Sequence, residues 1–542
     1  MDETELEEKI AEQVGEWSSN SNECFTIELV SGDGTVTSFN PEFTYPIFGE
    51  EEAIFGYQDL EINLSFAAHN LKSHLSISYG TKFPAQGEVK PTDIYEALRD
   101  FLPPKAFSNE DATQAVKDES AAQFRPPGER IHRYARGGQS YEIWCANMSD
   151  PAARELLQNM EILMPMFIEG GSMLQLEQDW TTQRWKLFLL YNITPKPEAG
   201  PAYSPFSLVG YGTSYRIFTF PDRTDSVESD LNIFAPSSQS IDDFLPPPDS
   251  TVENDLAPTA HPDNICSPLD LPSRERLSQF LILPPFQKEG HGQELYNAMY
   301  RALSNPSNVC EFTVEDPNEA FDDLRDLCDL LHLRAHDEEF AALRINTNLP
   351  ADKLMSETEL PTDIIVPVAT RNAIMKRTKL MQRQFDRLVE MHTLSAIPPL
   401  HRNRSRVTRR EKASNPHDKA YYIWRLYAKQ RLFLFNRDQL AQLERSERIE
   451  KLESALDAVQ TAYAEMIEKV EEREKKTARA IANGNGSPGV AKGGAEVEET
   501  QETPRKKERK RKVVEDDEDE DEEEGTAKVV TNGHKKARVD LT

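Results

Sequence analysis

The feature that most constrains the fold of this chain is the segment 278–293, which reads SQFLILPPFQKEGHGQ. It opens with an apolar run, FLIL, that has the length of a fully buried strand, and the two prolines after it would end that strand because proline cannot donate to a β-ladder. Apolar residues then recur at helical spacing from Leu295 to Leu303. The predicted order is strand, glycine-containing loop and helix, which directs backbone N–H groups and the positive end of a helix dipole at one point and suits a phosphate.

Two common phosphate-binding loops are excluded by the residues that follow the glycines. A Walker loop needs Gly-Lys-Ser/Thr, whereas Gly292 is followed by Gln293, and a dinucleotide fingerprint needs a third glycine where Leu295 stands. What remains is Gln-x-x-Gly-x-Gly, which resembles the pyrophosphate loop with which the GNAT acyltransferases hold acetyl-coenzyme A (acetyl-CoA). The alternative is an ordinary glycine turn between a strand and a helix.

The composition limits the partners and the compartment. The 542 residues predict two to four domains, and 38% hydrophobic residues with 35 prolines predict that part of the chain is disordered. A formal net charge of -31 disfavours direct nucleic-acid binding and favours a basic partner. No apolar stretch is long enough to span a membrane, and the acidic N-terminus does not read as a signal peptide. Five scattered cysteines fit a reducing compartment.

We predict an α/β (α+β) chain with the GNAT acetyltransferase fold, divided into four parts. An N-terminal mixed α/β domain covers residues 1–150 and a catalytic domain that binds acetyl-CoA covers residues 151–347, with a Ser/Pro/Asp-rich disordered insertion at 222–275. A helical bundle or long helical hairpin occupies residues 348–478, and a disordered charged tail occupies residues 479–542. In the tail, a basic cluster at 505–512 is typical of nuclear import, and the acidic run 515–524 would weaken nucleic-acid binding and attract histones.

Several shorter patterns predict individual elements. Strands are expected at residues 61–66, where apolar and polar residues alternate, and at 141–145, 184–191 and 309–314. Residues 208–212 and 215–220 are expected to form the two arms of a strand pair. Asp150-Pro151 and Asp316-Pro317 have the N-cap and first-position pattern that opens a helix.

If the loop holds an acyl-CoA, the reaction is attack of a nucleophile on a thioester. A lysine amine has a pKa near ~10.4 and must first lose a proton. Glu315, which closes the strand after the coenzyme helix, is the best-placed general base, although a strand-end glutamate is by default a solvated acid. Glu169 is a second possible base or a partner of the first. A backbone N–H around Leu281 or Ile282 would stabilise the thioester oxygen.

Three other features have simpler explanations beside a functional one. The acidic turn Glu50-Glu51-Glu52 is either a solvated turn or an anionic rim for a basic peptide. The pair His332 and His336 has i,i+4 spacing but no glutamate or cysteine partner for zinc. Cys310 and Cys328 are expected to pack in the core. The sequence contains no Gly-x-Ser-x-Gly elbow, so a serine hydrolase is not expected.

Four segments together resemble the catalytic subunit of the type B histone acetyltransferases, in a fungal form. They are FNPEFTYPIFGEEEAIFGYQDLEI, RWKLFLLY, SQFLILPPFQKEGHGQELY and FTVEDPNEAFDDLRD, in this order, and the resemblance runs from about residue 39 to residue 326. It implies acetyl transfer from acetyl-CoA, with no metal, to lysines near the N-terminus of free, newly made histone four.

The resemblance also implies roles for individual residues. Glu315 is the implied general base, and Glu50, Glu51 and Glu52 are implied to contact the histone tail together with Trp185, Tyr215, Arg216 and Ile217. The implied acetyl-CoA contacts are Phe280, Leu281, Ile282, Gln287, Lys288, Glu289, Gly290, His291, Gly292, Gln293, Asn318 and Leu327. Leu327 is apolar, so its side chain cannot form the hydrogen bond to the coenzyme that a polar residue at this position would form.

The implied partners are histone four, bound with histone three as a dimer, and a WD-repeat histone chaperone subunit. The implied localisation is both nucleus and cytoplasm. Two other functions stay open from the residues alone: a non-catalytic histone chaperone with a vestigial coenzyme fold, and an acetyltransferase for small-molecule amines. Which lysines are modified, and whether Glu169 shares the role of base, do not follow from the sequence.

Overall fold

The structure, a computed structural model, describes residues 15–85, 89–108, 119–176, 179–194, 203–219, 268–350, 360–407 and 415–482. The chain divides into two compact units, one of residues 1–349 and 361–396 and one of residues 350–360 and 397–542. Most of the predicted insertion and nearly all of the predicted tail, with its basic cluster and acidic run, lie outside the described residues. The disorder predicted for them stays a prediction.

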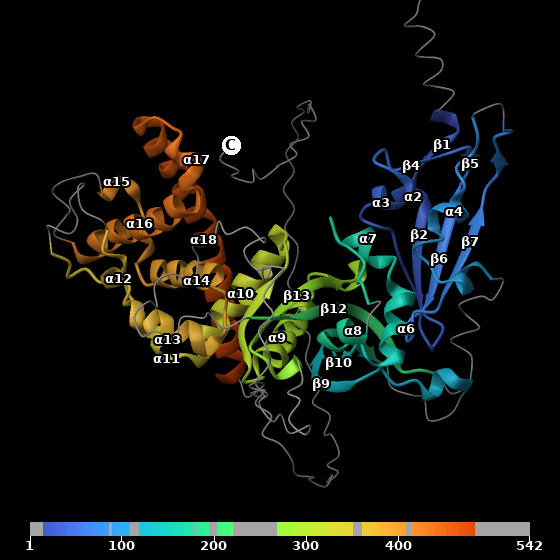
Figure 1. The fold of residues 1–542 in the computed structure, drawn as a ribbon, viewed down its shortest axis with the longest axis horizontal. Coiled ribbons are helices and arrows are strands. Elements are labelled where there is room, and N and C mark those ends of the chain that lie inside the picture. The colour runs from blue at the N-terminus through green and yellow to red at the C-terminus, as the bar shows by residue number, and fades with distance from the viewer. Residues whose placement is uncertain are drawn as a thin grey trace, which may run out of the picture. The chain divides into compact units, whose positions relative to one another are not determined.

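The first unit begins with a small four-stranded sheet whose strand order is β3-β2-β6-β7 (Figure 1). Its strands are β2 (Phe25–Val30), β3 (Val36–Phe39), β6 (Glu61–Ala67) and β7 (Ser73–Ser78). Two short pairs, β1 (Ser18–Asn20) with β4 (Ala53–Phe55) and β5 (Tyr57–Gln58) with β8 (Thr81–Lys82), and the helices α2 (Ser21–Cys24), α3 (Tyr45–Phe48) and α4 (Ile94–Leu98) complete this region. Alternating burial along β6 confirms the half-buried strand predicted at residues 61–66.

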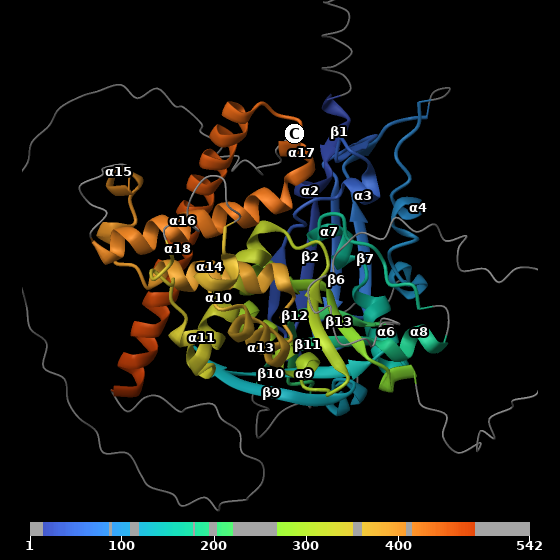
Figure 2. The same ribbon diagram turned by 60° about the vertical axis from the view of Figure 1, so that its left-hand side comes forward.

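A six-stranded sheet forms the centre of the same unit, in the order β14-β13-β12-β11-β10-β9. Its strands are β9 (Glu129–Arg136), β10 (Gln139–Asn147), β11 (Trp185–Ile193), β12 (Phe206–Phe218), β13 (Ser273–Ile282) and β14 (Val309–Val314). All neighbours are antiparallel except β13 and β14. The sheet is strongly curved, and Figure 2 shows its β9 edge beside the start of α9 (His291–Ser304).

Helices pack around this sheet, and of the two predicted helix N-caps one is observed and one is not. The remaining helices of the unit are α6 (Pro151–Met160), α7 (Leu163–Phe167), α8 (Asp179–Arg184), α10 (Glu319–His336), α11 (Glu338–Ala342), α12 (Thr362–Ile365), α13 (Val368–Thr378) and α14 (Gln382–Ser395). Asp150 caps α6 through the N–H of Ala152, as predicted. The predicted cap of α10 is wrong: Asn318, not Asp316, accepts the N–H of Phe321 at 2.9 Å. Asp316 has a φ of 33° and stands outside the helix.

Three strand predictions need correction. Residues 208–212 and 215–220 are not two arms of a pair, because β12 runs from Phe206 to Phe218 without a turn; Phe220 lies outside the described residues. The expected insertion ends too late, because Ser273 to Glu275 already pair with β12 and β14. The strand before the glycine loop is not fully buried: every second residue of β13 is only half-buried, so the apolar run FLIL packs on two different faces.

The unit boundaries also differ from the predicted domain boundaries. The strands β9 and β10 lie before residue 150 but belong to the six-stranded sheet. The helices α12 to α14 lie after residue 348 but belong to the first unit. Buried residues of both sheets form one continuous hydrophobic core, so no break occurs at residue 150. Cys328 is buried as expected, whereas Cys310 is exposed, contrary to expectation.

The second unit is helical, as predicted, and its longest elements form a hairpin. It contains α15 (Arg404–Val407), α16 (Pro416–Phe435), α17 (Arg437–Ala441) and α18 (Arg445–Ala482). Helix α16 packs along α18, and Arg425 joins them by ion pairs to Glu453 at 2.6 Å and to Asp457 at 3.0 Å. Among the described helices of either unit, none is both long enough and apolar enough to cross a bilayer.

A buried ion cluster fixes the register of three strands of the six-stranded sheet. Glu275 of β13 is fully buried, and its Oε1 accepts hydrogen bonds from Arg216 of β12 at 2.7 Å and from Lys186 of β11 at 2.8 Å. Because removing one partner of a buried ion pair leaves the other charge uncompensated, this cluster resists any slip between the strands.

Replacement of Glu275 by alanine should therefore lower the free energy of unfolding by about 3–5 kcal/mol, measured by urea denaturation. Glu311→Ala is the matched control, because its pair with Arg274 is partly exposed and should contribute less than about 1 kcal/mol. Equal losses from the two substitutions would contradict the role given to Glu275.

Candidate functional site

The site begins where β13 loses one of its two neighbours. Pairing between β13 and β14 stops at Leu277, opposite Val314, and a β-bulge shifts the register between β13 and β12 at the same level. The N–H of Glu315 closes the last ladder bond with the carbonyl of Leu277 at 2.9 Å. Beyond the bulge, residues 280–282 pair with β12 on one side, and the other edge of residues 278–282 has no strand partner in the described part of the chain.

The backbone N–H groups on this open edge follow from strand alternation. Leu283 donates its N–H to Val209 of β12 at 2.9 Å, so the N–H of Leu281 also points toward β12. The N–H groups of Phe280 and Ile282 then point toward the open edge, as does the carbonyl of Ile282, which accepts from Gln287 Nε2 at 2.9 Å. Of the two N–H groups named as expected oxyanion donors, that of Ile282 points to the open edge and that of Leu281 does not.

The side chains of the predicted FLI segment divide between two faces. Leu281 is buried in the core. Phe280 packs edge-on against Phe321 of α10, with ring centroids 5.0 Å apart, and Ile282 lies under the start of α9 near Gly292. The segment therefore anchors the open edge between the core and helices α9 and α10.

The glycine loop runs from the end of β13 into α9, as predicted. Lys288 and Gly290 both have positive φ, 62° and 87°, and Gly290 is the N-cap of α9 without any side-chain cap. The first N–H groups of a helix have no intrahelical partner, so His291, Gly292 and Gln293 present bare backbone donors with the positive end of the helix dipole. Glu289 is exposed, and a side chain at Gly292 would press on Leu324.

The side chain of His291 is buried in the protein and does not point to the ligand side of the loop. Its Nδ1 lies 2.7 Å from the hydroxyl of Tyr134 on β9. Burial lowers the pKa of His291, so the ring is neutral near neutral pH. The side chain pins the loop to the sheet, and only the backbone of this residue is available to a ligand.

The predicted base, Glu315, stands at the end of β14 with both carboxylate oxygens oriented. Tyr215 donates its hydroxyl to Oε1 at 3.0 Å, and Ser278 donates to Oε2 at 2.6 Å. Burial raises the pKa of Tyr215, although the hydrogen bond from Arg276 acts in the opposite direction, so the phenol stays a donor. Two donors of this kind hold a carboxylate in one orientation.

A row of cross-strand neighbours leads to Glu315 across the sheet. Trp185, Tyr215 and Arg276 are paired residues on β11, β12 and β13. The rings of Trp185 and Tyr215 are 4.5 Å apart, and Arg276 reaches the Tyr215 hydroxyl at 3.4 Å. Trp185 and Tyr215 line a cavity of about 460 Å³ together with Ser278, Glu315 and the segment 172–175. The structure thus brings together the predicted base and two of the predicted tail-contacting residues.

Other predicted residues lie elsewhere. Arg216 points to the opposite face of β12, where Glu275 binds it, so its side chain is engaged inside the protein. Ile217 is half-buried one strand period beyond Tyr215. Glu169 is exposed in the turn after α7 and does not line the cavity. Asn318 caps α10 three residues after Glu315, and Leu327 is half-buried on that helix.

The acidic turn divides into one structural and two exposed glutamates. The carboxylate of Glu52 accepts the N–H of Thr44 at 2.6 Å, the N–H of Tyr45 at 3.2 Å and the amide of Asn22 at 2.7 Å. It therefore caps α3 from outside the helix. Glu50 and Glu51 are exposed in the turn and remain available to a basic ligand.

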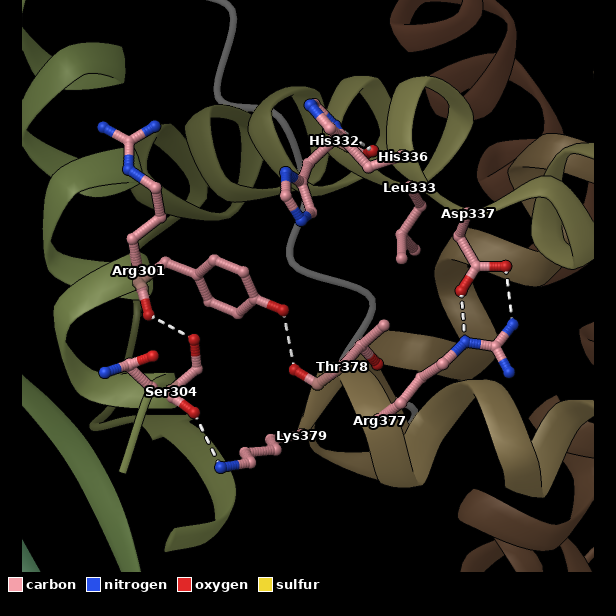
Figure 3. A pocket seen from close by; sticks show the side chains of 11 residues that line it. Arg301, Ser304, His332, Leu333, His336, Asp337, Arg377, Thr378 and Lys379 are labelled. Carbon is pink, nitrogen blue, oxygen red and sulfur yellow. Dashed lines mark hydrogen bonds and ion pairs between the residues drawn. The ribbon is translucent and has the colours of Figure 1, made fainter. Parts of the chain in front are cut away.

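A second cavity, of about 650 Å³, lies among the C-terminal ends of α9, α10 and α13 (Figure 3). The rings of His332 and His336 stack there with centroids 4.6 Å apart, and Asp337 is held by Arg377 at 2.6 and 2.7 Å. The described residues contain no group of three His, Cys, Asp or Glu side chains that could hold a metal ion.

Sequence reasoning missed three residues of the site: Ser278, Arg276 and Arg136. Ser278 and Arg276 reach Glu315 and Tyr215 only because of the bulge in β13 and the pairing with β12, which no local pattern reveals. Arg136, at the end of β9, contacts the glycine loop from the far edge of the curved sheet. Its only signal is its place in the alternating strand 129–136.

Comparison with known proteins identifies close relatives. The family described as "Histone acetyl transferase HAT1 N-terminus" matches residues 17–169. A protein of Aspergillus oryzae named "Histone acetyltransferase type B catalytic subunit" is 38% identical over 449 residues, which are 79% of this chain and 81% of that protein. A protein of the same name from Cryptococcus neoformans is 31% identical over 470 residues, which are 80% of this chain and 93% of that protein.

The two roles within the acidic turn predict different effects on stability. Glu52→Ala should lower the free energy of unfolding by about 1–2 kcal/mol, because it removes the acceptor of two backbone N–H groups at the start of α3. Glu51→Ala, in the same turn, should leave the thermal transition unchanged. Scanning calorimetry measures both, and an unchanged transition in Glu52→Ala would refute the capping role.

Proposed function

The chain belongs to the histone acetyltransferase type B catalytic subunits and is a histone acetyltransferase, and on this basis we propose a substrate and a mechanism for it. The proposed reaction transfers the acetyl group of acetyl-CoA to lysine side chains in the N-terminal tail of free histone four, by direct attack with Glu315 as general base. The observation that supports it most is the position of the Glu315 carboxylate, held by two donors beside the open edge of β13.

The proposed coenzyme site is the glycine loop, the bare start of α9 and the open edge of β13, in a GNAT fold. When bound, acetyl-CoA supplies an acyl group activated as a thioester. The residues present fit it: α9 offers its first N–H groups with no side-chain cap, which suits a diphosphate. The N–H groups of Phe280 and Ile282 would stabilise the negative charge that develops on the thioester oxygen.

The proposed peptide site is the cavity on the other side of Glu315. Aromatic rings of Trp185 and Tyr215 form one wall, which suits the aliphatic part and the cationic end of a lysine side chain. Glu315 takes the proton that the amine must lose before it attacks. Exposed Glu50 and Glu51 would attract other basic residues of the tail, whereas Glu52 and Arg216 are engaged internally and are not assigned to the substrate.

Three further elements of the proposal rest on the family resemblance. The histone is bound as a dimer of histones three and four, the partner is a WD-repeat histone chaperone subunit, and the enzyme occurs in nucleus and cytoplasm. The basic cluster at 505–512 supports nuclear entry. The relatives are named catalytic subunits, which favours an enzyme over the non-catalytic chaperone that the residues alone left open.

Glu315→Gln should lower kcat on a histone-four tail peptide by about 10²–10⁴-fold, because a neutral amide cannot accept the proton. The KM for acetyl-CoA should stay within about twofold. Glu319→Gln is the control, since Glu319 is an exposed acid in the first turn of α10. Mass spectrometry of the peptide measures the rate and identifies the modified lysines.

Full activity of Glu315→Gln would overturn the assignment of the base. If wild type and variant both bind the peptide and neither acetylates it, the non-catalytic chaperone reading is correct instead. Faster turnover of a polyamine than of the peptide by wild type would indicate a small-molecule acetyltransferase.

A further inference from the structure

Strand β9 contacts the glycine loop and the first turn of α9 through three side chains on one face. His132, Tyr134 and Arg136 alternate along the strand and therefore point the same way. His132 Nε2 lies 3.3 Å from Glu294 Oε2, Tyr134 lies 2.7 Å from His291 Nδ1, and Arg136 donates to the carbonyl of Glu289 at 2.6 Å. We call these three residues the β9 clamp.

The clamp reaches the loop because the sheet is curved. β9 and β14 are the two edges of the six-stranded sheet, yet β9 lies beside the start of α9 (Figure 2). The contacts join residues more than 150 positions apart in the chain, such as Arg136 and Glu289. The open edge of β13 and the far edge of the same sheet thus hold the loop from two sides.

The guanidinium of Arg136 packs directly against Gly290. A Cβ atom at Gly290 would lie 2.3 Å from Nη1 of Arg136, and the φ of Gly290 is 87°, a conformation that side chains disfavour. The guanidinium therefore occupies the space that a side chain would take. It holds the carbonyl of the preceding residue and so fixes the peptide unit that leads into the helix N-terminus.

Arg136 also pairs with a negative charge at the N-terminus of α9, that of Glu294. Glu294 lies in the first turn of α9, where its negative charge would oppose a bound diphosphate. Arg136 Nη2 pairs with Glu294 Oε1 at 3.2 Å, and His132 contacts the other oxygen. Burial alone would raise the pKa of Glu294, but its hydrogen bonds and charge contacts with His132 and Arg136 lower it, so the ionised carboxylate is paired with the guanidinium of Arg136.

We propose that the β9 clamp holds the glycine loop in the conformation that binds the diphosphate of acetyl-CoA, with Arg136 as its principal positioning residue. The inference rests on the proposed coenzyme role of the loop and is independent of Glu315. Arg136 acts on the coenzyme through the loop: it orients the backbone donors and neutralises Glu294. Its loss weakens coenzyme binding and leaves the chemical step and the peptide site intact.

The test compares Arg136→Ala with Arg133→Ala in the full-length enzyme. Arg133 lies on the same strand, points to the other face and is well exposed, so its removal matches the change in charge and length without touching the loop. Arg136→Ala should raise the KM and the calorimetric Kd for acetyl-CoA about tenfold or more, the loss expected when a charge-assisted hydrogen bond is removed. The kcat at saturating acetyl-CoA and the KM for the histone peptide should stay within about twofold.

Two further variants separate the possible failures. Arg136→Lys keeps the charge but not the fork that reaches both partners, so its KM should lie between wild type and Arg136→Ala. Gly290→Ala should raise the KM for acetyl-CoA because it disturbs the loop itself. If Gly290→Ala raises this KM and Arg136→Ala does not, the clamp is refuted while the loop assignment stands; if neither does, the proposed coenzyme loop fails.

A purely structural role for Arg136 predicts a different pattern. The melting temperature would fall, and the two KM values would rise together or not at all, which would also refute the clamp. If Arg136→Ala does not fold, Tyr134→Phe replaces it, because it removes one hydroxyl and keeps the ring stacked on Tyr141. A rise of a few-fold in the KM for acetyl-CoA alone is then the expected result, and no change is the contrary one.

Discussion

The whole site depends on a strand that keeps one neighbour and loses the other. β13 pairs with β14 only as far as Leu277, while its pairing with β12 continues to Ile282. An unpaired backbone edge inside a protein is costly unless something satisfies it, and here a ligand would do so. The β-bulge at the same level turns the N–H groups of Phe280 and Ile282 outward and brings Ser278 to Glu315. One local irregularity thus positions both the proposed oxyanion donors and a support for the proposed base.

The regular part of the sheet keeps this irregularity in place. On β11, β12 and β13, consecutive residues point to opposite faces. Trp185 and Tyr215 line the cavity and Arg276 contacts the Tyr215 hydroxyl, whereas their neighbours Lys186, Arg216 and Glu275 form the buried ion cluster. A slip of one residue would exchange the two sets. Since burying an unpaired charge is strongly unfavourable, the cluster specifies the register that orients Glu315.

The sequence predicted what local patterns determine and missed what distant partners determine. The order of strand, loop and helix around Gly290, the strand that ends at Glu315, and the helical hairpin of the second unit follow from periodicity and turn residues. The engagement of Glu52 by Thr44 and Asn22, and of Arg216 by Glu275, depends on tertiary contacts that no local pattern shows. The observed N-cap of α10 is Asn318 and not the predicted Asp316, because the side chain of Asn318 accepts a free N–H of the first turn.

Backbone hydrogen exchange tests the central claim, that the open edge of β13 accepts the thioester while the glycine loop accepts the diphosphate. Exchange in residues 278–293 would be followed by mass spectrometry, with and without acetyl-CoA. The account predicts slower exchange on binding at Phe280, at Ile282 and in the first turn of α9, and unchanged exchange in the segment 206–212 of β12. Unchanged exchange throughout residues 278–293, at a coenzyme concentration that supports turnover, would contradict it.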